Sequence, residues 1–214
     1  MCDRSLATSL LFDLCPGGKS RTSLDYLIEM PPVVGRSYVP NQMWRHQAIA
    51  KAGRTDVLLK EYRTVWAKMR SVVDNRTVSE HWSVRSDSAD QYSHNGVVPL
   101  MILFSEIAGI KPTEVGFVEY EVRPQLADLK SLDLTYHTPF GPIEFSSRLR
   151  GGSHTITIDT PSGCSGTMRV AKDARADASL IPESFLEDES AGESSYSLAD
   201  GDRLEITIPA TLTR

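Results

Sequence analysis

Residues 108–124 read AGIKPTEVGFVEYEVRP, and the apolar period of the chain changes within this stretch. Before it, apolar residues recur at helical spacing, whereas in its second half Val118, Tyr120 and Val122 alternate with charged residues. Strict alternation is typical of a strand with one buried face, and a 3.6-residue period indicates a helix. The stretch therefore predicts a boundary between two modules. The predicted modules are residues 1–112 and 113–214.

Downstream of this stretch the chain contains several short alternating runs, separated by turns rich in glycine and proline. Short strands with regular turn signals predict an antiparallel β-sandwich. One segment, Asp173 to Asp202, is rich in Ala, Ser, Glu and Asp, and we predict that it forms a long surface loop, partly disordered. The alternating residues are Leu132 and Leu134, Ile143 and Phe145, Ile156 and Ile158, Met168 and Val170, and Leu204, Ile206 and Ile208.

The first half of the chain is predicted to be helical, with short loops that imply antiparallel neighbours. One helix, which begins after Pro99, is apolar almost all round, so we expect it to be buried inside a larger helical assembly. Helices followed by strands, without alternation between them, indicate an α+β fold with two modules.

The helix that follows Thr55 has one apolar stripe, and its opposite, charged face is expected to face water. Trp66 lies on the stripe, and we therefore expect it in the core. The stripe consists of Leu58, Leu59, Tyr62, Val65, Trp66 and Met69, and the charged face of Lys60, Glu61, Arg63, Lys68 and Arg70.

The composition argues against several classes of protein. The 214 residues carry a formal net charge of -5, whereas a nucleic-acid-binding surface is basic. The longest apolar run, VVPLMILF, is too short to span a membrane. The N-terminus lacks the features of a signal peptide, which favours a cytoplasmic location. Three distant cysteines form neither a metal-binding spacing nor a disulfide framework, and the sequence contains no cofactor-binding motif.

Residues 77–95 read TVSEHWSVRSDSADQYSHN and lack an apolar period. Glu80 precedes Trp82 by two residues, and an indole beside a carboxylate is expected to desolvate it and raise its basicity. An aromatic ring also offers a sugar an apolar face, and polar neighbours can bond its hydroxyls. By composition alone, a solvated loop whose acids cap the helix at Pro99 is the favoured interpretation, since loops are usually polar. The polar neighbours are Arg85, Asp87, Asp90, Tyr92 and His94.

Two aromatic residues outside this stretch are further candidates for contact with a ligand. Tyr38 lies in an extended, proline-flanked loop from which it could reach a pocket. Trp44 lies on the next predicted helix, where packing is the more usual role. A zinc site built from His81, Asp90 and His94 matches no established ligand spacing, so we predict no metal site.

Four stretches of the chain resemble the C-terminal portion of bacterial-type α-L-rhamnosidases. These glycoside hydrolases have a catalytic toroid of six helix pairs, an (α/α)6 fold, followed by a small β-sandwich. The resemblance extends from Leu6 to Ile158 and implies a partial toroid followed by a sandwich. The stretches are SYVPNQMWRHQAIAKAGRTDVLLKEYRTVWAKM (37–69), TVSEHW (77–82), YSHNGVVPLMILFSEIAGIKPTEVGFVEYEVRPQLADL (92–129) and HTPFGPIEF (137–145).

The resemblance implies hydrolysis of terminal α-L-rhamnosides with inversion, by two carboxylic groups of which one activates water. The family's base is the glutamate of a Thr-x-x-Glu-x-Trp motif, which corresponds here to Glu80. Family members often carry an aromatic residue where this chain has Ser79. A histidine shortly after the motif contacts sugar hydroxyls in the family, and the nearest match is His94. Trp82 would line the same subsite, with Tyr38 and Trp44 as further candidates.

The resemblance also implies that the family's general acid comes from toroid helices earlier than those found here. We therefore expect this chain to be a fragment, or one part of a split protein, that hydrolyses little or nothing by itself. A self-associating chain, whose helical edge a second copy covers, is an alternative. So is a non-catalytic carbohydrate-binding or structural module derived from the same fold.

Overall fold

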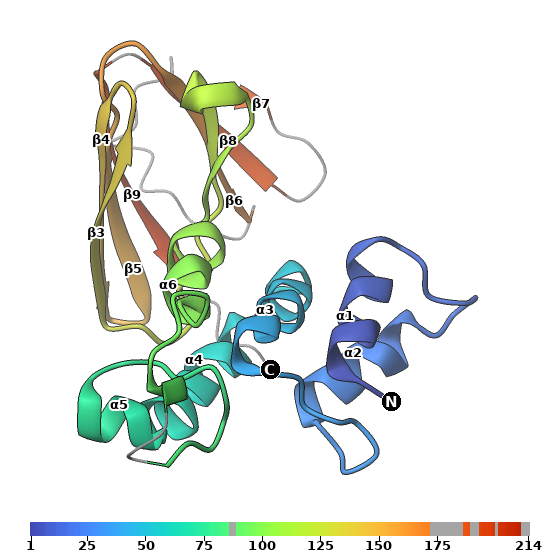
Figure 1. The fold of residues 1–214 in the computed structure, drawn as a ribbon. Helices are drawn as coiled ribbons and strands as arrows, with labels where there is room; N and C mark the ends of the chain where they lie inside the picture. Colours follow the sequence, from blue (N-terminus) through green and yellow to red (C-terminus); the bar gives the residue numbers. More distant parts are fainter. Residues whose placement is uncertain (86–88, 172–185, 189–192, 200, 211–214) are drawn as a thin grey trace. The chain divides into compact units, whose positions relative to one another are not determined.

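The computed structural model describes residues 1–85, 89–171, 186–188, 193–199 and 201–210. The chain forms two compact units, Met1–Leu103 and Phe104–Arg214 (Figure 1). The first unit is helical, and the second is built from strands. Within the described ranges, no helix is both long enough and apolar enough to cross a membrane.

The helices of the first unit pack around α3. Helix α3 contacts α1, α2, α4 and α6. Leu27, Ile49, Leu58 and Ile102, which lie on α2, α3, α4 and α6, are completely buried, and Trp66 is buried in the core as expected. The helices are α1 (Asp3–Leu11), α2 (Ser20–Glu29), α3 (Gln42–Lys51), α4 (Thr55–Thr64), α5 (Arg70–Asn75) and α6 (Val98–Ile102), with 3₁₀ turns η1 (Val39–Asn41), η2 (Trp66–Lys68) and η3 (Ala89–Gln91).

The prediction that the whole charged face of the helix after Thr55 faces water is wrong at Glu61. This residue is only 8% exposed, and its Oε2 accepts a hydrogen bond of 2.7 Å from Arg45 Nη1. Glu61 follows Leu58 by three residues and therefore lies beside the apolar stripe. The buried face of α4 is wider than the stripe because Arg45, on the neighbouring α3, supplies a compensating charge.

The helix at Pro99 is buried on one face only in this chain, whereas the prediction placed it inside a larger helical assembly. Val98 and Ile102 are buried, whereas Leu100 and Met101 are 54% and 44% exposed. Helix α6 packs on α3 by one face only. Among the residues that the structure describes, the face of α6 that carries Leu100 and Met101 therefore stays exposed.

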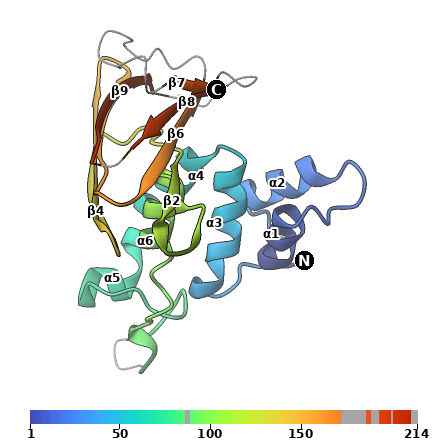
Figure 2. The same ribbon diagram turned by 90° about the horizontal axis from the view of Figure 1, so that it is seen from above.

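The second unit is a β-sandwich, as predicted. Its five-stranded sheet has the order β1-β2-β6-β8-β7, and its four-stranded sheet has the order β3-β4-β5-β9. Figure 2 shows the two layers, with β4 in one and β2 and β6 in the other. All pairs are antiparallel except β2 with β6. The strands are β1 (Ile110–Pro112), β2 (Glu119–Val122), β3 (Ser131–Thr138), β4 (Gly141–Arg150), β5 (Ser153–Asp159), β6 (Ser165–Ala171), β7 (Leu186–Asp188), β8 (Glu193–Leu198) and β9 (Arg203–Pro209).

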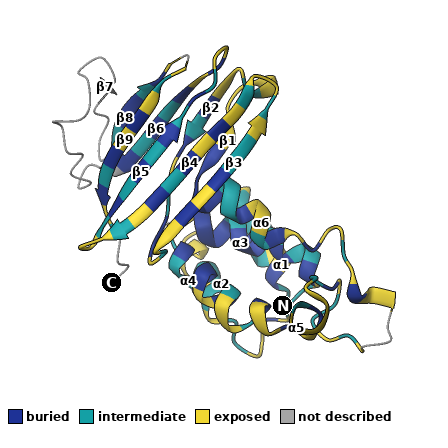
Figure 3. Cartoon of the chain, turned by 90° about the vertical axis from the view of Figure 1, so that its left-hand side faces the viewer, coloured by how far each residue is buried: buried dark blue, intermediate teal, exposed yellow. Residues whose placement is uncertain are grey.

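Alternation along the strands builds the core of the sandwich, and Figure 3 shows buried and exposed residues taking turns along β4. Ile143 and Phe145 of β4 lie opposite Tyr136 and Leu134 of β3 in the antiparallel register. The alternating residues predicted from the sequence are buried in every strand of this sheet. They are Leu132, Leu134, Ile143, Phe145, Ile156, Ile158, Leu204, Ile206 and Ile208.

The stretch 108–124 turns sharply before it enters the sheet. Gly109 adopts φ +76°, and a Cβ there would stand 2.0 Å from the carbonyl oxygen of Arg123. Only glycine combines this backbone angle with such a close approach. The approach lets Arg123 N donate to Gly109 O at 3.0 Å, which extends the pairing of Ile110 with Val122. The sequence motif therefore fixes the first hairpin of the sandwich.

The predicted surface loop Asp173–Asp202 is wrong where the structure describes it. Residues 186–188 form β7 and residues 193–198 form β8, which pairs with β6. Tyr196 and Leu198 of β8 are buried. We did not predict β8 because serines occupy most of the positions beside Tyr196 and Leu198. The remainder of the predicted loop lies largely outside the described residues.

Candidate functional site

The stretch 77–95 folds back on itself after α5. Its two ends lie side by side, because Ser93 N donates to Val78 O at 3.0 Å and Glu80 N donates to Asp90 O at 3.3 Å. Gly96 follows as a buried residue, where a Cβ would stand 3.0 Å from a methyl of Val78. The described parts of the loop, residues 77–85 and 89–95, therefore have a defined backbone path although they contain little apolar sequence.

Gln91 holds the loop from within and is only 6% exposed. Its amide nitrogen donates to Arg85 O at 2.9 Å, and its carbonyl Oε1 accepts a hydrogen bond from Asn75. Its backbone oxygen accepts a hydrogen bond of 2.9 Å from the hydroxyl of Thr77. One buried amide thus joins the end of α5 to both sides of the loop, which is how a buried polar side chain is normally satisfied.

Ser79 fixes the backbone immediately before Glu80. It is 1% exposed, and its hydroxyl lies 3.0 Å from that of Ser71 and donates to His81 O at 2.7 Å. Ser71 Oγ also accepts from Ser79 N at 3.2 Å. A small hydroxyl residue suits this buried, hydrogen-bonded position.

Glu80 itself is exposed. The desolvation by Trp82 that the sequence led us to expect is not seen, because the indole is directed to other partners. Its Nε1 donates to Ser37 O at 2.7 Å, the guanidinium of Arg36 lies 4.7 Å from the ring centroid, and the Trp66 ring packs edge to face at 5.2 Å. Trp82 is accordingly half-buried and held by the protein on more than one side.

Tyr38 is 59% exposed, and its ring meets the His81 ring edge to face, with centroids 4.8 Å apart. His81 is the neighbour of Glu80, so the structure brings Tyr38 to the Glu80 loop from the segment before α3. An exposed aromatic ring beside an exposed carboxylate is an arrangement suited to a sugar.

His94 and Trp44 are placed differently from each other. His94 is exposed and follows Ser93, whose backbone pairs with Val78, so it lies on the same folded loop as Glu80. Trp44 is half-buried on α3, and among the described residues no hydrogen bond or ring contact joins it to the loop.

A buried charged cluster beneath the loop was not predicted. Glu61 Oε1 lies 3.3 Å from Trp66 Nε1, 3.6 Å from His46 Nε2 and 3.8 Å from Arg36 Nη1, and its other oxygen is bonded to Arg45. Burial opposes ionisation of Glu61, but His46 and the Arg45 charge outweigh it and hold the pKa of the carboxyl well below its usual range.

His46 and Tyr62 are the neutral members of this cluster. Burial lowers the pKa of His46 in spite of the neighbouring Glu61 carboxylate, so the imidazole is neutral near pH 7. Its Nδ1 lies 3.0 Å from the hydroxyl of Tyr62, whose pKa is raised by burial. Glu61 follows Leu58 by three residues and so borders the apolar stripe, but its burial depends on Arg45 of another helix, which the local sequence does not reveal.

The residues that the structure describes contain no group of three or more His, Cys, Asp or Glu side chains able to hold a metal ion. In particular, the region of His81, Asp90 and His94 offers no such group.

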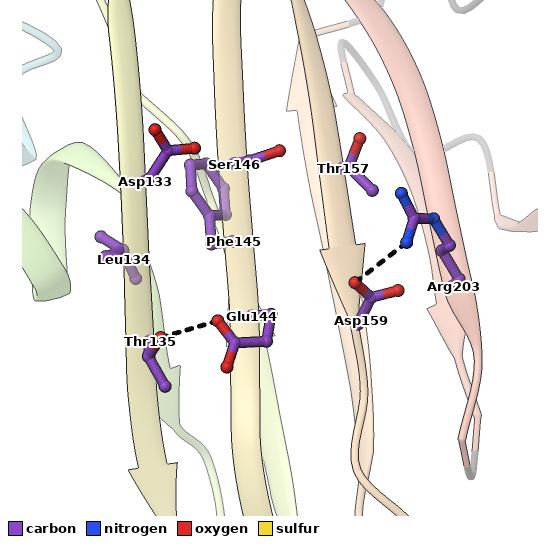
Figure 4. Close-up of a pocket in the computed structure, with 9 residues that line it drawn as sticks. All are labelled: Asp133, Leu134, Thr135, Glu144, Phe145, Ser146, Thr157, Asp159 and Arg203. Atoms are coloured by element: carbon purple, nitrogen blue, oxygen red, sulfur yellow. Dashed lines mark hydrogen bonds and ion pairs between the residues drawn. The ribbon is translucent and has the colours of Figure 1, made fainter.

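The second unit carries a hollow of about 340 Å³ on the outer face of the four-stranded sheet (Figure 4). Its polar groups already bond one another: Thr135 donates to Glu144 at 2.7 Å, and Arg203 donates to Asp159 at 3.4 Å. Phe145 is the aromatic residue in its lining, but its side chain is buried in the core. The hollow thus offers hydroxyls and carboxylates without an exposed aromatic surface, unlike the loop around Glu80.

Comparison with known families gives one match within the chain. Residues 109–180 match the family described as the bacterial alpha-L-rhamnosidase C-terminal domain. The match begins at Gly109, in the stretch where the helical period gives way to strands. A comparison with curated protein sequences gives no significant match.

Solved structures resemble the chain over almost its whole length. The α-L-rhamnosidase of Streptomyces avermitilis, solved in complex with L-rhamnose, is 18% identical with a TM-score of 0.71, and covers 96% of this chain and 21% of its own. The α-L-rhamnosidase of Dictyoglomus thermophilum is 17% identical with a TM-score of 0.73, covering 97% of this chain and 25% of its own. That of Aspergillus terreus is 17% identical with a TM-score of 0.72, covering 96% and 24%.

The chain therefore spans about a fifth to a quarter of the length of these enzymes. At such low identity the likeness concerns the fold, and it includes the helical unit as well as the sandwich. Residues 109–180 match the bacterial α-L-rhamnosidase C-terminal domain, and the chain as a whole has the fold of the C-terminal part of an α-L-rhamnosidase.

Proposed function

We propose that the loop 77–95 forms one side of a site that hydrolyses terminal α-L-rhamnosides, with Glu80 as the general base. In inverting hydrolysis a carboxylate removes a proton from water as the water attacks the anomeric carbon, while a second carboxyl protonates the leaving oxygen. Glu80 takes the first of these roles. Its exposed carboxylate is accessible to a water molecule and to a sugar.

The observation that carries this proposal is that Glu80 combines an exposed side chain with a fixed backbone. Ser79, directly before it, is buried and bonded to Ser71, and Trp82, two residues later, is bonded to Ser37 O. A catalytic carboxylate has to be held close to its working position by the groups around it. A solvated loop with no function would not require an attachment on each side of one acid, at Ser79 and at Trp82.

Aromatic and polar residues around Glu80 would contact the sugar. Tyr38, which meets His81 edge to face, supplies an exposed ring for the apolar face of a rhamnose. His94, exposed on the same loop, would bond a hydroxyl. Trp82 would line the subsite by its accessible edge. Trp44 has no comparable support.

The general acid of this mechanism would come from protein outside this chain. Roughly 6.5–9.5 Å must separate the two carboxyls of an inverting enzyme, so that water fits between base and sugar. We assign the acid to the remainder of the longer rhamnosidases, of which this chain spans about a fifth. The chain by itself should then bind L-rhamnose but hydrolyse aryl α-L-rhamnosides little or not at all.

The test uses the purified 214-residue chain. Titration with L-rhamnose, followed by ¹H–¹⁵N NMR, should shift the amide signals of the 77–95 loop and the indole signal of Trp82 in a saturable way. D-Glucose serves as the control sugar, and Tyr38→Ala should weaken the response. A parallel assay with an aryl α-L-rhamnoside should give negligible turnover.

Three results would count against the proposal in different ways. Absence of saturable shifts in the loop at high L-rhamnose would remove the sugar site. Robust hydrolysis by the chain alone would show that it holds its own general acid. The chain can also be combined with the remaining helices of a longer rhamnosidase. If that assembly binds L-rhamnose but shows no turnover, and Glu80→Gln does not change the binding, a non-catalytic carbohydrate-binding module is favoured.

A further inference from the structure

The indole of Trp82 contacts two residues of the segment before α3, Arg36 and Ser37, and Trp66 of η2. Ser37 O accepts a 2.7 Å hydrogen bond from the indole nitrogen, and the guanidinium carbon of Arg36 lies 4.7 Å from the ring centroid. The Trp66 ring meets it at 79°, with centroids 5.2 Å apart. A guanidinium at this distance is attracted to the face of an indole, the strongest of the aromatic acceptors.

Arg36 also reaches the buried charged cluster. Its Nη1 lies 3.8 Å from Glu61 Oε1, and its side chain is 29% exposed whereas that of Glu61 is 8% exposed. The same carboxylate is fixed by Arg45 at 2.7 Å and by Trp66 Nε1 at 3.3 Å. Arg36 therefore lies between a rigid, buried carboxylate and a half-exposed indole.

We infer that Arg36 is a positioning residue for Glu80: it holds the Trp82 indole against the helical core and so fixes the backbone on the C-terminal side of the carboxylate. This inference rests on the proposed function of Glu80. Ser79, buried and bonded to Ser71, fixes the other side. Ser79 and Trp82 are thus both attached to the protein, and Glu80 between them is the exposed side chain of the segment 79–82.

The same contacts divide the roles of the aromatic residues. Since Arg36 covers part of the Trp82 ring and Ser37 O occupies its nitrogen, Trp82 serves mainly to hold the loop. Tyr38, 59% exposed, is then the ring that remains available to a sugar. Loss of Tyr38 should remove a sugar contact directly, whereas loss of the Arg36 contact should weaken binding through the loop.

Arg36→Lys is the informative substitution. Lysine keeps a positive charge toward Glu61, but its compact ammonium lacks the planar surface that stacks on an indole. Arg45 still neutralises Glu61, so the fold should persist. Arg36→Met, which retains an apolar stem and loses the charge, is the second variant in case the first is less stable than expected. Arg4→Lys, at an exposed position of α1, is the matched control.

Three measurements on the full ¹⁵N-labelled chain test the inference: hydrogen exchange of the Trp82 indole N–H, L-rhamnose affinity by NMR titration, and urea unfolding. In Arg36→Lys the indole protection should fall about 2- to 30-fold, the range that corresponds to a cation–π contact. The affinity for L-rhamnose should fall by a similar factor, while the urea midpoint stays close to that of the wild type. Arg4→Lys should change none of the three.

The outcomes separate the inference from the proposed function. Unchanged indole protection in both Arg36 variants would overturn the inference, whatever happens to sugar binding. Reduced protection with an unchanged L-rhamnose affinity would also overturn it, because Arg36 would then be structural only. A wild-type chain that shows no saturable L-rhamnose shifts would overturn the proposed function, and with it any positioning role for Arg36.

Discussion

Substitution of Glu61 by glutamine should destabilise the first unit strongly. Arg45 is 1% exposed, and the 2.7 Å contact with Glu61 supplies its compensating charge. Glutamine preserves the volume and can still accept the hydrogen bond from Trp66, but it leaves the Arg45 guanidinium buried without a counter-charge at hydrogen-bonding distance. Breaking one partner of a buried pair costs about 3–5 kcal/mol. That is a large share of the roughly 5–15 kcal/mol by which a domain is stable.

The assay can report on this unit alone, because all three tryptophans, Trp44, Trp66 and Trp82, lie in it. Urea unfolding followed by tryptophan fluorescence should give a lower midpoint for Glu61→Gln with an unchanged m-value. Glu29→Gln, at an exposed position of α2, is the control and should stay within about 0.5 kcal/mol of the wild type.

A double variant tests the cause of the loss. If an uncompensated Arg45 charge is responsible, Arg45→Met combined with Glu61→Gln should cost less than the sum of the two single substitutions, as coupled neighbours do. A loss of about 1 kcal/mol or less for Glu61→Gln would refute the reasoning, since exposed ion pairs contribute that little. Strict additivity in the double variant would refute it as well.

Three further predictions concern pH, backbone and loop. Acidification from about pH 7.5 to 5 should destabilise the first unit. Unfolded His46 takes up a proton near its ordinary pKa of about 6.5, whereas burial beside Arg45 and Arg36 lowers the pKa of the folded imidazole. Urea titrations at several pH values check this, and His46→Gln should flatten the dependence of the unfolding free energy on pH. Below about pH 4.3 the low folded pKa of Glu61 should add a second loss of the same sign. Gly109→Ala should cost about 2–5 kcal/mol of stability, since the new Cβ meets both a positive φ and the Arg123 carbonyl. Gly152→Ala, at a positive φ in open space, should cost about 1–2 kcal/mol. Thermal unfolding followed by circular dichroism compares the stabilities of the two variants. Ser79→Ala should cost about 1–3 kcal/mol in urea and speed amide exchange at Glu80, because Ser71 Oγ and His81 O lose a partner.

The sandwich could be predicted largely from alternation, because one buried face in a two-layer fold imposes a strict period of two. Ile143 and Phe145 show it most clearly, because the exposed Pro142 precedes them and the exposed Glu144 lies between them. The same rule failed at β8, where Ser194, Ser195 and Ser197 surround the buried Tyr196 and Leu198. Burial there depends on the partner strand β6 and on the opposite sheet, and neither is visible in the local composition.

The helical unit was less predictable because its interior contains charge. From helical periodicity, a carboxylate is predicted to be exposed to solvent. Glu61 is buried instead, because Arg45 on another helix is buried with it. Such pairing depends on tertiary contacts that a single sequence does not reveal. The exposed face of α6 illustrates the converse. Leu100 and Met101 follow the rule for a core helix, yet both stay exposed in the part of the chain that the structure describes.

The Glu80 loop shows which properties of a site are local and which are not. Its motif and the backbone attachments at Ser79 and Trp82 come from neighbouring sequence and from one adjoining segment, so they are complete within this chain. The basicity of a catalytic carboxylate depends instead on exclusion of water by whatever closes over it, since burial is what favours its protonated form. Glu80 is exposed here. A chain that supplies a positioned carboxylate without the enclosure is thus expected to recognise a sugar before it can activate water, which is why binding, and not turnover, is the decisive measurement on the chain alone.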